Sequence, residues 1–149
     1  MNEIDQLRNK LQKMLIELNG GIEIDGDGDF TIVGDSAHLF IREHEFTVGE
    51  EKRYVIRFFC PLTRNVAVTP DLTLHVATEG AEFRFGHIRL ILNDDVKTGG
   101  LYFDYSIFAN DLDISEVDNA IRCVLFTSAK LDTELHAKFG GEMFGKDQE

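Results

Sequence analysis

Residues 115–141, SEVDNAIRCVLFTSAKLDTELHAKFGG, decide the fold because they predict one long amphipathic helix. Its apolar side chains recur at three- and four-residue steps and so share one face of the helix: Val117, Ile121, Val124, Leu125, Leu131 and Leu135. Ser115, with Asp118 three residues later, resembles a capping box, so the helix is expected to start at Val117. Gly140-Gly141 should end it, and Asp132-Thr133 marks a candidate kink.

A second amphipathic helix is predicted near the start of the chain. Its apolar residues form one stripe: Ile4, Leu7, Leu11, Met14, Leu15 and Leu18. Asn19-Gly20-Gly21 supplies a stop, because glycine readily takes the left-handed conformation that ends a helix. Since each of the two helices has a single apolar stripe, each must pack against a sheet or another chain.

The residues between the two helices predict a sheet. Runs rich in β-branched and aromatic residues indicate strands at 30–33, 37–41, 53–59, 65–68, 87–92 and 101–108. Thr69 and Pro70 begin a short helix that reaches Ala77, and residues 93–100 form a hairpin turn. Within the strand at 53–59, the polar Arg57 indicates one partly wet face.

This order of elements predicts an α+β fold. An antiparallel sheet would carry the N- and C-terminal helices on one face, in the order α-β(3-4)-α-β(2)-α. Residues 1–149 contain no repeat or linker and are expected to form a single domain. Residues 142–149 are expected to be a frayed tail.

The composition constrains the partners. The net charge of −12 would repel a phosphate backbone and an anionic membrane, so neither is an expected partner. A basic or amphipathic polypeptide fits such a surface better, although many cytosolic proteins are acidic only to remain soluble. The chain has no apolar run of the ~20 residues that span a membrane and no signal peptide, so we expect a cytoplasmic protein.

The residues that could support chemistry do not assemble into a motif. In a reducing compartment Cys60 and Cys123 are expected to be two buried thiols. The turn Asp25–Asp29 resembles a calcium loop, but position 12 of that loop, counted from Asp25, is Ser36 where glutamate is required. A solvated Asx-type turn is the better interpretation.

Gly34-Asp35-Ser36 resembles the nucleophile turn of GDSL-type esterases. Such enzymes need an Asp-x-x-His pair, whereas Asp132 and His136 are one residue too far apart and lie on a predicted helix. The histidines share no metal-binding spacing: His38, His44, His75, His87 and His136. Gly20-Gly21 follows a helix instead of preceding one, and the paired carboxylates Asp94-Asp95 and Asp111-Asp113 lie in predicted turns. We therefore predict no enzyme, no catalytic residues, no cofactor and no metal.

Several segments resemble the YbjN-like branch of the type III secretion chaperone-like fold. They are Phe85-Gly86-His87, the acidic turn after Leu92, residues 112–117, Phe139-Gly140-Gly141 and the strand opening at 27–36. The likeness spans about residues 22 to 141. It implies a helix–sheet–helix domain that handles peptides as a chaperone or adaptor, often as a dimer. It carries over no particular ligand residues.

Two functional hypotheses remain. The first is a polypeptide-binding chaperone, adaptor or regulator, which an exposed apolar groove or face would favour. The second is a small-ligand or metal-binding regulatory domain, which a closed pocket with convergent polar groups would favour. The two apolar helix stripes also predict a homodimer joined through apolar helix or sheet-edge surface, although a monomer with both helices on one sheet face is the alternative.

Overall fold

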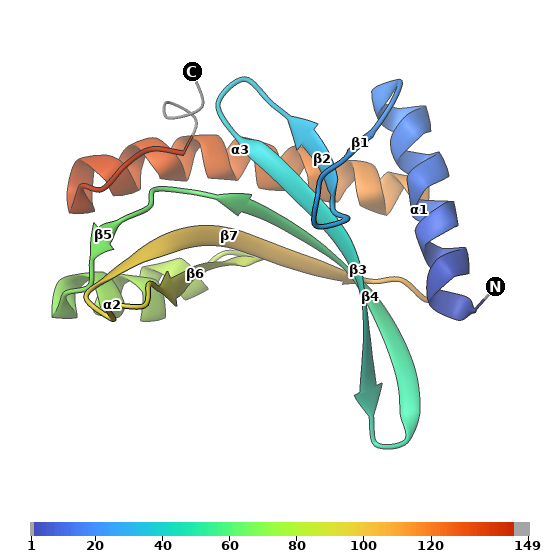
Figure 1. The fold of residues 1–149 in the computed structure, drawn as a ribbon, viewed down its shortest axis with the longest axis horizontal. Helices are drawn as coiled ribbons and strands as arrows, with labels where there is room; N and C mark the ends of the chain where they lie inside the picture. Colours follow the sequence, from blue (N-terminus) through green and yellow to red (C-terminus); the bar gives the residue numbers. More distant parts are fainter. Residues whose placement is uncertain (1, 145–149) are drawn as a thin grey trace.

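A computed structural model of the protein describes residues 2–144, and all strand pairs in its sheet are antiparallel (Figure 1). The strands are β1 (Glu23–Ile24), β2 (Phe30–Val33), β3 (His38–Val48), β4 (Glu51–Pro61), β5 (Val66–Ala67), β6 (His87–Leu92) and β7 (Thr98–Phe108). The helices are α1 (Glu3–Asn19), α2 (Pro70–Ala77), the short 3-10 helix η1 (Glu79–Ala81) and α3 (Ile114–Phe139).

In the sheet, β7 pairs with three other strands: β4, β5 and β6. Strands β1 to β4 follow one another as neighbours, and β4 pairs with β7. Asp104 pairs with Phe59 of β4 and with His87 of β6, so β6 lies along the opposite edge of β7 from β4. The first residues of β7 also pair with β5. Residues 98–108 are therefore the second strand from the β6 edge and join β4, β5 and β6, although they come late in the chain.

The core lies between one face of this sheet and the helices. Residues that oppose one another across β3, β4 and β7, such as Ile41 with Phe58 and Cys60 with Phe103, are fully buried on that face. α1 packs on β3, and α3 packs across β3, β4 and β7. Leu11 and Leu15 are fully buried in α1, as is Val124 in α3. The predicted α+β fold with both terminal helices on one sheet face is confirmed.

The ends of α3 partly correct the sequence-based prediction. The helix begins at Ile114, three residues before the expected start, because Asp113 is the cap: its carboxylate accepts hydrogen bonds from the backbone N–H and the hydroxyl of Ser115. The helix continues without interruption through Asp132-Thr133, so the candidate kink is wrong. Its end at Gly140, where φ is 76°, agrees with the prediction.

The other helix and the tail differ from expectation in detail. α1 ends at Gly20 as predicted, but Leu18 at the end of its apolar stripe is 36% exposed. The expectation of a frayed tail is wrong at Glu142, whose backbone N–H and C=O both bond to Arg64 at 2.8 Å. Residues 145–149 lie outside the described residues.

Strands β3 and β4 form a hairpin much longer than the sequence predicts. They pair from Phe40 with Phe59 out to Val48 with Glu51, and Gly49 takes a φ of 63° in the turn. Figure 1 shows the outer half of this hairpin projecting away from the helices. That half buries no side chain, so the alternation of apolar and polar residues by which strands are recognised is weak there.

Candidate functional site

Within residues 2–144, the face of the sheet that points away from the helices is uncovered. Its side chains in β3, β4 and β7 alternate with the buried ones and are partly or fully exposed, apart from Asp104. We call this surface the open face; it includes Phe40, Arg42, His44 and Phe46 of β3, Arg53, Val55, Arg57 and Phe59 of β4, Tyr102, Asp104, Ser106 and Phe108 of β7, and His87 and Arg89 of β6.

Phenylalanine rings gather on the open face. Phe40 and Phe59 oppose each other across β3 and β4, with ring centroids 5.4 Å apart and planes inclined by 16°. The ring centroid of Phe46 lies 6.4 Å from that of Phe108, and Phe108 is 67% exposed. Aromatic pairs of this kind add stability beyond their buried area. An exposed group of large apolar side chains is also typical of surfaces that contact another molecule.

A charged cluster lies beside these rings. The Arg57 guanidinium donates through Nε to Oδ1 of Asp104 at 2.8 Å and through Nη2 to Oδ2 at 2.6 Å. Arg89 Nη1 reaches the same Oδ2 at 3.3 Å. Asp104 is only 4% exposed, and a buried carboxylate requires such partners. The paired Arg57 also stacks on Phe59, with Cζ 4.3 Å from the ring centroid.

The arginines also affect a neighbouring histidine. Burial and then the positive charges of Arg57 and Arg42 lower the pKa of His44 below its usual value. Arg42 itself pairs with Asp29 at the start of β2. His44 Nε2 is buried and has no hydrogen-bond partner within the described residues. His44 therefore favours its neutral form, and the positive charge of this part of the face resides on arginines.

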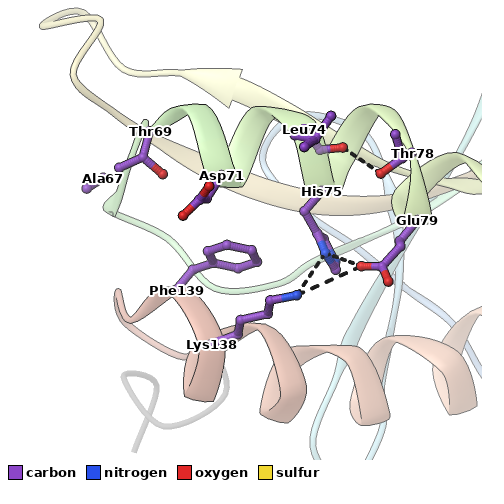
Figure 2. Close-up of a pocket in the computed structure, with 9 residues that line it drawn as sticks. All are labelled: Ala67, Thr69, Asp71, Leu74, His75, Thr78, Glu79, Lys138 and Phe139. Atoms are coloured by element: carbon purple, nitrogen blue, oxygen red, sulfur yellow. Dashed lines mark hydrogen bonds and ion pairs between the residues drawn. The ribbon is translucent and has the colours of Figure 1, made fainter.

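A groove of about 610 Å³ separates α2 from the C-terminal end of α3 (Figure 2). His75 Nδ1 lies 2.6 Å from a Glu79 carboxylate oxygen, and Lys138 Nζ lies 3.9 Å from that oxygen and 3.5 Å from His75 Nδ1. Phe139 packs edge-on against His75, and Leu74 is 63% exposed at the rim. His75, Glu79 and Lys138 of this groove thus pair with one another. This differs from the closed pocket with convergent polar groups expected for a small-ligand domain.

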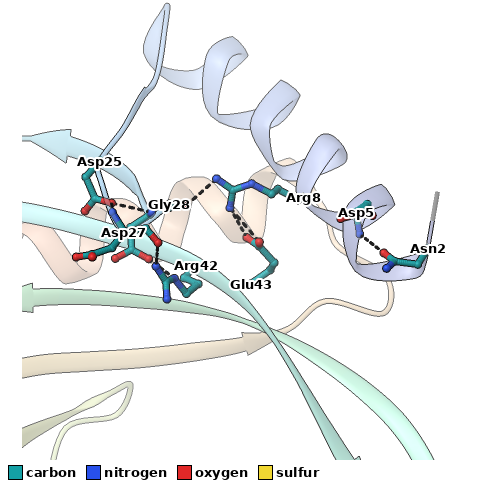
Figure 3. A network of polar contacts seen from close by, with 9 residues as sticks. Asn2, Asp5, Arg8, Asp25, Asp27, Gly28, Arg42 and Glu43 are labelled. Atoms are coloured by element: carbon teal, nitrogen blue, oxygen red, sulfur yellow. Dashed lines mark hydrogen bonds and ion pairs between the residues drawn. The ribbon is translucent and has the colours of Figure 1, made fainter.

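The Asp25–Asp29 turn is held as an Asx turn, as predicted. One oxygen of Asp25 accepts the backbone N–H groups of both Asp27 and Asp29 at 2.9 Å. Figure 3 shows two arginines that hold the turn. Arg42 donates to the Asp27 carbonyl. Arg8 donates to the Gly28 carbonyl at 2.7 Å and also to the Glu43 carboxylate. Within residues 2–144 no three side chains of the His, Cys, Asp or Glu type are grouped so that they could hold a metal ion.

The esterase-like residues do not form a triad. Gly34 N–H bonds to the Ala37 carbonyl at 2.8 Å, which closes a tight turn between β2 and β3. Ser36 lies beside Leu125, Phe126 and Ala129, whereas Asp132 and His136 are on later turns of α3.

The two cysteines have different environments. Burial raises the pKa of the Cys60 thiol to about 12, which makes it an inert core group. Cys123 is exposed, so the prediction of two buried thiols is wrong for it: the residue lies on the solvent side of α3. Both cysteines are free.

No partner-binding residues were predicted from the sequence, although one signal was present. The polar Arg57 inside an apolar run predicted a strand with a partly wet face, and this is where the open face lies. Its other members could not be grouped without the register, because they come from four strands spread over residues 40–108. No helix within residues 2–144 has the length and apolar character needed to cross a membrane.

Comparison with known proteins gives one family and one solved fold. A family model described as "T3SS (YopN, CesT) and YbjN peptide-binding chaperone 1" matches residues 5–147. The crystal structure of YbjN from E. coli, which is described only provisionally as a transcription regulator, superposes with a TM-score of 0.61. The identity is 13%, over 88% of this chain and 92% of that one, so the likeness is one of fold. No curated protein matches the chain.

Proposed function

The chain belongs to the family of T3SS (YopN, CesT) and YbjN peptide-binding chaperones 1, and on this premise we propose that it is a polypeptide-binding chaperone or adaptor. We propose that it acts without catalysis, in the cytoplasm, and as a single domain over residues 1–149. The observation that carries the proposal is the open face, where stacked and exposed phenylalanine rings lie on a sheet surface that no helix of the described part of the chain covers.

An extended segment could bind this surface in two ways. Its apolar side chains could lie across the rings of Phe40, Phe59 and Phe108, which supply apolar area on a rigid sheet. Its backbone could also pair with β6, whose only strand partner within the described residues is β7. Ile91 and Leu92 at the end of β6 are 41% and 47% exposed, so apolar contacts are available beside that edge.

Removal of one exposed ring should weaken binding. We expect Phe108→Ala to reduce the affinity for a fluorescein-labelled 16-residue peptide of alternating leucine and serine about fivefold, because aromatic anchors contribute roughly 1 kcal/mol each. Fluorescence anisotropy would measure it. Leu74→Ala, which removes a side chain of similar exposure on α2, is the matched control and should change the affinity less than twofold. Equal losses in both variants, or no binding of the peptide at millimolar protein concentration, would contradict the proposal.

We also propose a homodimer that uses the helix side of the molecule. Phe126 on α3 is 77% exposed and borders a hollow of about 360 Å³ formed with Leu125 and the turn of residues 34–37. A two-fold contact would place the Phe126 ring of each copy in the hollow of the other, since symmetric pairs bury the same patch twice. This arrangement would leave both open faces free for a partner.

Gel filtration with light scattering tests the dimer. At micromolar concentration the wild type should have the mass of two chains, and Phe126→Ser should have the mass of one, because the ring that fills the opposite hollow is lost. Leu74→Ala should remain a dimer. A wild-type mass of one chain that persists on concentration would show that the proposed dimer does not form.

A further inference from the structure

The arginines of this acidic protein are concentrated on the open face. The chain has 27 acidic residues against 15 lysines and arginines. Among strand residues that point to the open side, four are cationic: Arg42, Arg53, Arg57 and Arg89. Three are acidic: Glu23, Glu51 and Asp104. Asp29 also faces this side and pairs with Arg42, and Glu51 pairs with Arg53, so positive and negative charges balance on the open face although the whole chain carries −12.

A local excess of positive charge remains beside Asp104, at Arg89. A single carboxylate, Asp104, is shared by two guanidinium groups, and Arg57 occupies both of its oxygens. Arg89 makes one longer contact, 3.3 Å to Oδ2, and its side chain is 48% exposed. Because a guanidinium has five N–H donors in a planar fork, Arg89 retains donors that can bind a second carboxylate.

Apolar surface lies close to this charge. Arg57 connects Asp104 to the ring of Phe59, which stacks on Phe40. The open face therefore presents, in a continuous row, a guanidinium with spare donors, a neutralised ion pair and a pair of aromatic rings. A ligand that matches this row combines at least one carboxylate with apolar side chains a few residues away.

We infer that the open face binds an acidic, apolar-rich segment of a partner polypeptide, with a partner carboxylate on Arg89 and apolar side chains on the Phe40–Phe59 pair. The inference deepens the proposed function and rests on it. A nucleic-acid strand fits less well, because a row of phosphates needs several uncompensated cations and would be repelled by the remaining surface. A basic segment, which the whole-chain charge favours, would place like charges against Arg57 and Arg89.

Three labelled 16-residue peptides with the same alternating leucines and with glutamate, lysine or serine at the polar positions test the charge preference. At 150 mM salt, screening over about 8 Å limits the comparison to local charges. We expect the glutamate peptide to bind the wild type at least fivefold more tightly than the lysine peptide. Arg89→Gln should weaken the glutamate peptide about fivefold and change the serine peptide less than twofold.

Arg122→Gln on α3 is the matched control, because it removes the same charge from a side chain that is 77% exposed on the helix side. It should leave all affinities within twofold of wild type. Equal or tighter binding of the lysine peptide, equal effects of the two variants, or tighter binding of a 15-nucleotide deoxythymidine strand would each overturn the inference. If one of these outcomes occurs but the serine peptide still binds, only the charge inference fails and the proposed function stands. If no peptide binds, the inference and the proposed function both fail.

Discussion

Val124→Asp should lower the free energy of unfolding by several kcal/mol. Val124 is fully buried in α3, and a carboxylate placed there would have neither water nor a cation as a partner. Such a substitution costs roughly 4 kcal/mol or more, against a total stability of about 5–15 kcal/mol for a typical domain. Urea denaturation followed by circular dichroism would show the loss as a lower midpoint or as a chain already unfolded in buffer.

The neighbouring positions on α3 provide graded controls. Leu125 is half-buried, so Leu125→Asp should cost less than Val124→Asp. Cys123 is exposed, and Cys123→Asp should change the free energy of unfolding by less than about 0.5 kcal/mol. Equal midpoints for the Val124 and Cys123 variants would mean that α3 presents a different face to the sheet than the structure describes.

Asp132→Asn should stabilise the protein, and increasingly so as the pH rises from about 4 to above 6. Asp132 is 4% exposed on α3, and its Oδ1 has no hydrogen-bond partner within residues 2–144. Burial raises the pKa of its carboxyl from 3.8 to about 6, while the nearby His136 opposes this shift. Between these two pH values the folded protein binds more protons than the unfolded chain, so its free energy of unfolding falls as pH rises.

A shift of about two pKa units corresponds to roughly 3 kcal/mol, which the charged carboxylate costs the fold above pH 6. The amide of asparagine is neutral at every pH, so the variant should match wild type at pH 4 and exceed it by roughly 2–3 kcal/mol at pH 7. Thermal or urea unfolding at several pH values would measure the difference. Asp94→Asn, in the exposed β6–β7 turn, controls for the loss of one negative charge. A gain in the free energy of unfolding that does not depend on pH, or that is equal in Asp132→Asn and Asp94→Asn, would contradict this explanation.

The fold was predictable where one face of an element is buried. Helical spacing identified α3 because Ile121, Val124 and Leu135 all contact the core. The same logic fails where nothing is buried: the outer half of the β3–β4 hairpin, the two-residue β1, and Leu18 and Cys123 on the solvent sides of their helices. The cap of α3 was misplaced because Asp113 and Ser115 are both good capping residues, and only the backbone conformation decides between them.

The candidate site was less predictable than the fold. Net charge is a sum over all surfaces, and it pointed to a basic or amphipathic partner, whereas Arg57 and Arg89 come together only when β7 is placed between β4 and β6. That placement joins residues about 50 positions apart, and no local pattern encodes it. The pairing of Phe40 with Phe59 depends in the same way on the register of the long hairpin.

The position of β7 and α3 late in the chain has a consequence for biosynthesis. The β3–β4 hairpin can form as soon as its two strands leave the ribosome, because its turn is local. Its partner β7 emerges dozens of residues later, and α3, which covers the apolar side of all three strands, follows every strand. Until then α1 covers only part of the apolar side of the nascent sheet, and the rest is exposed, which is a state prone to aggregation. During its own synthesis this member of a chaperone family thus passes through a stage in which it resembles a client.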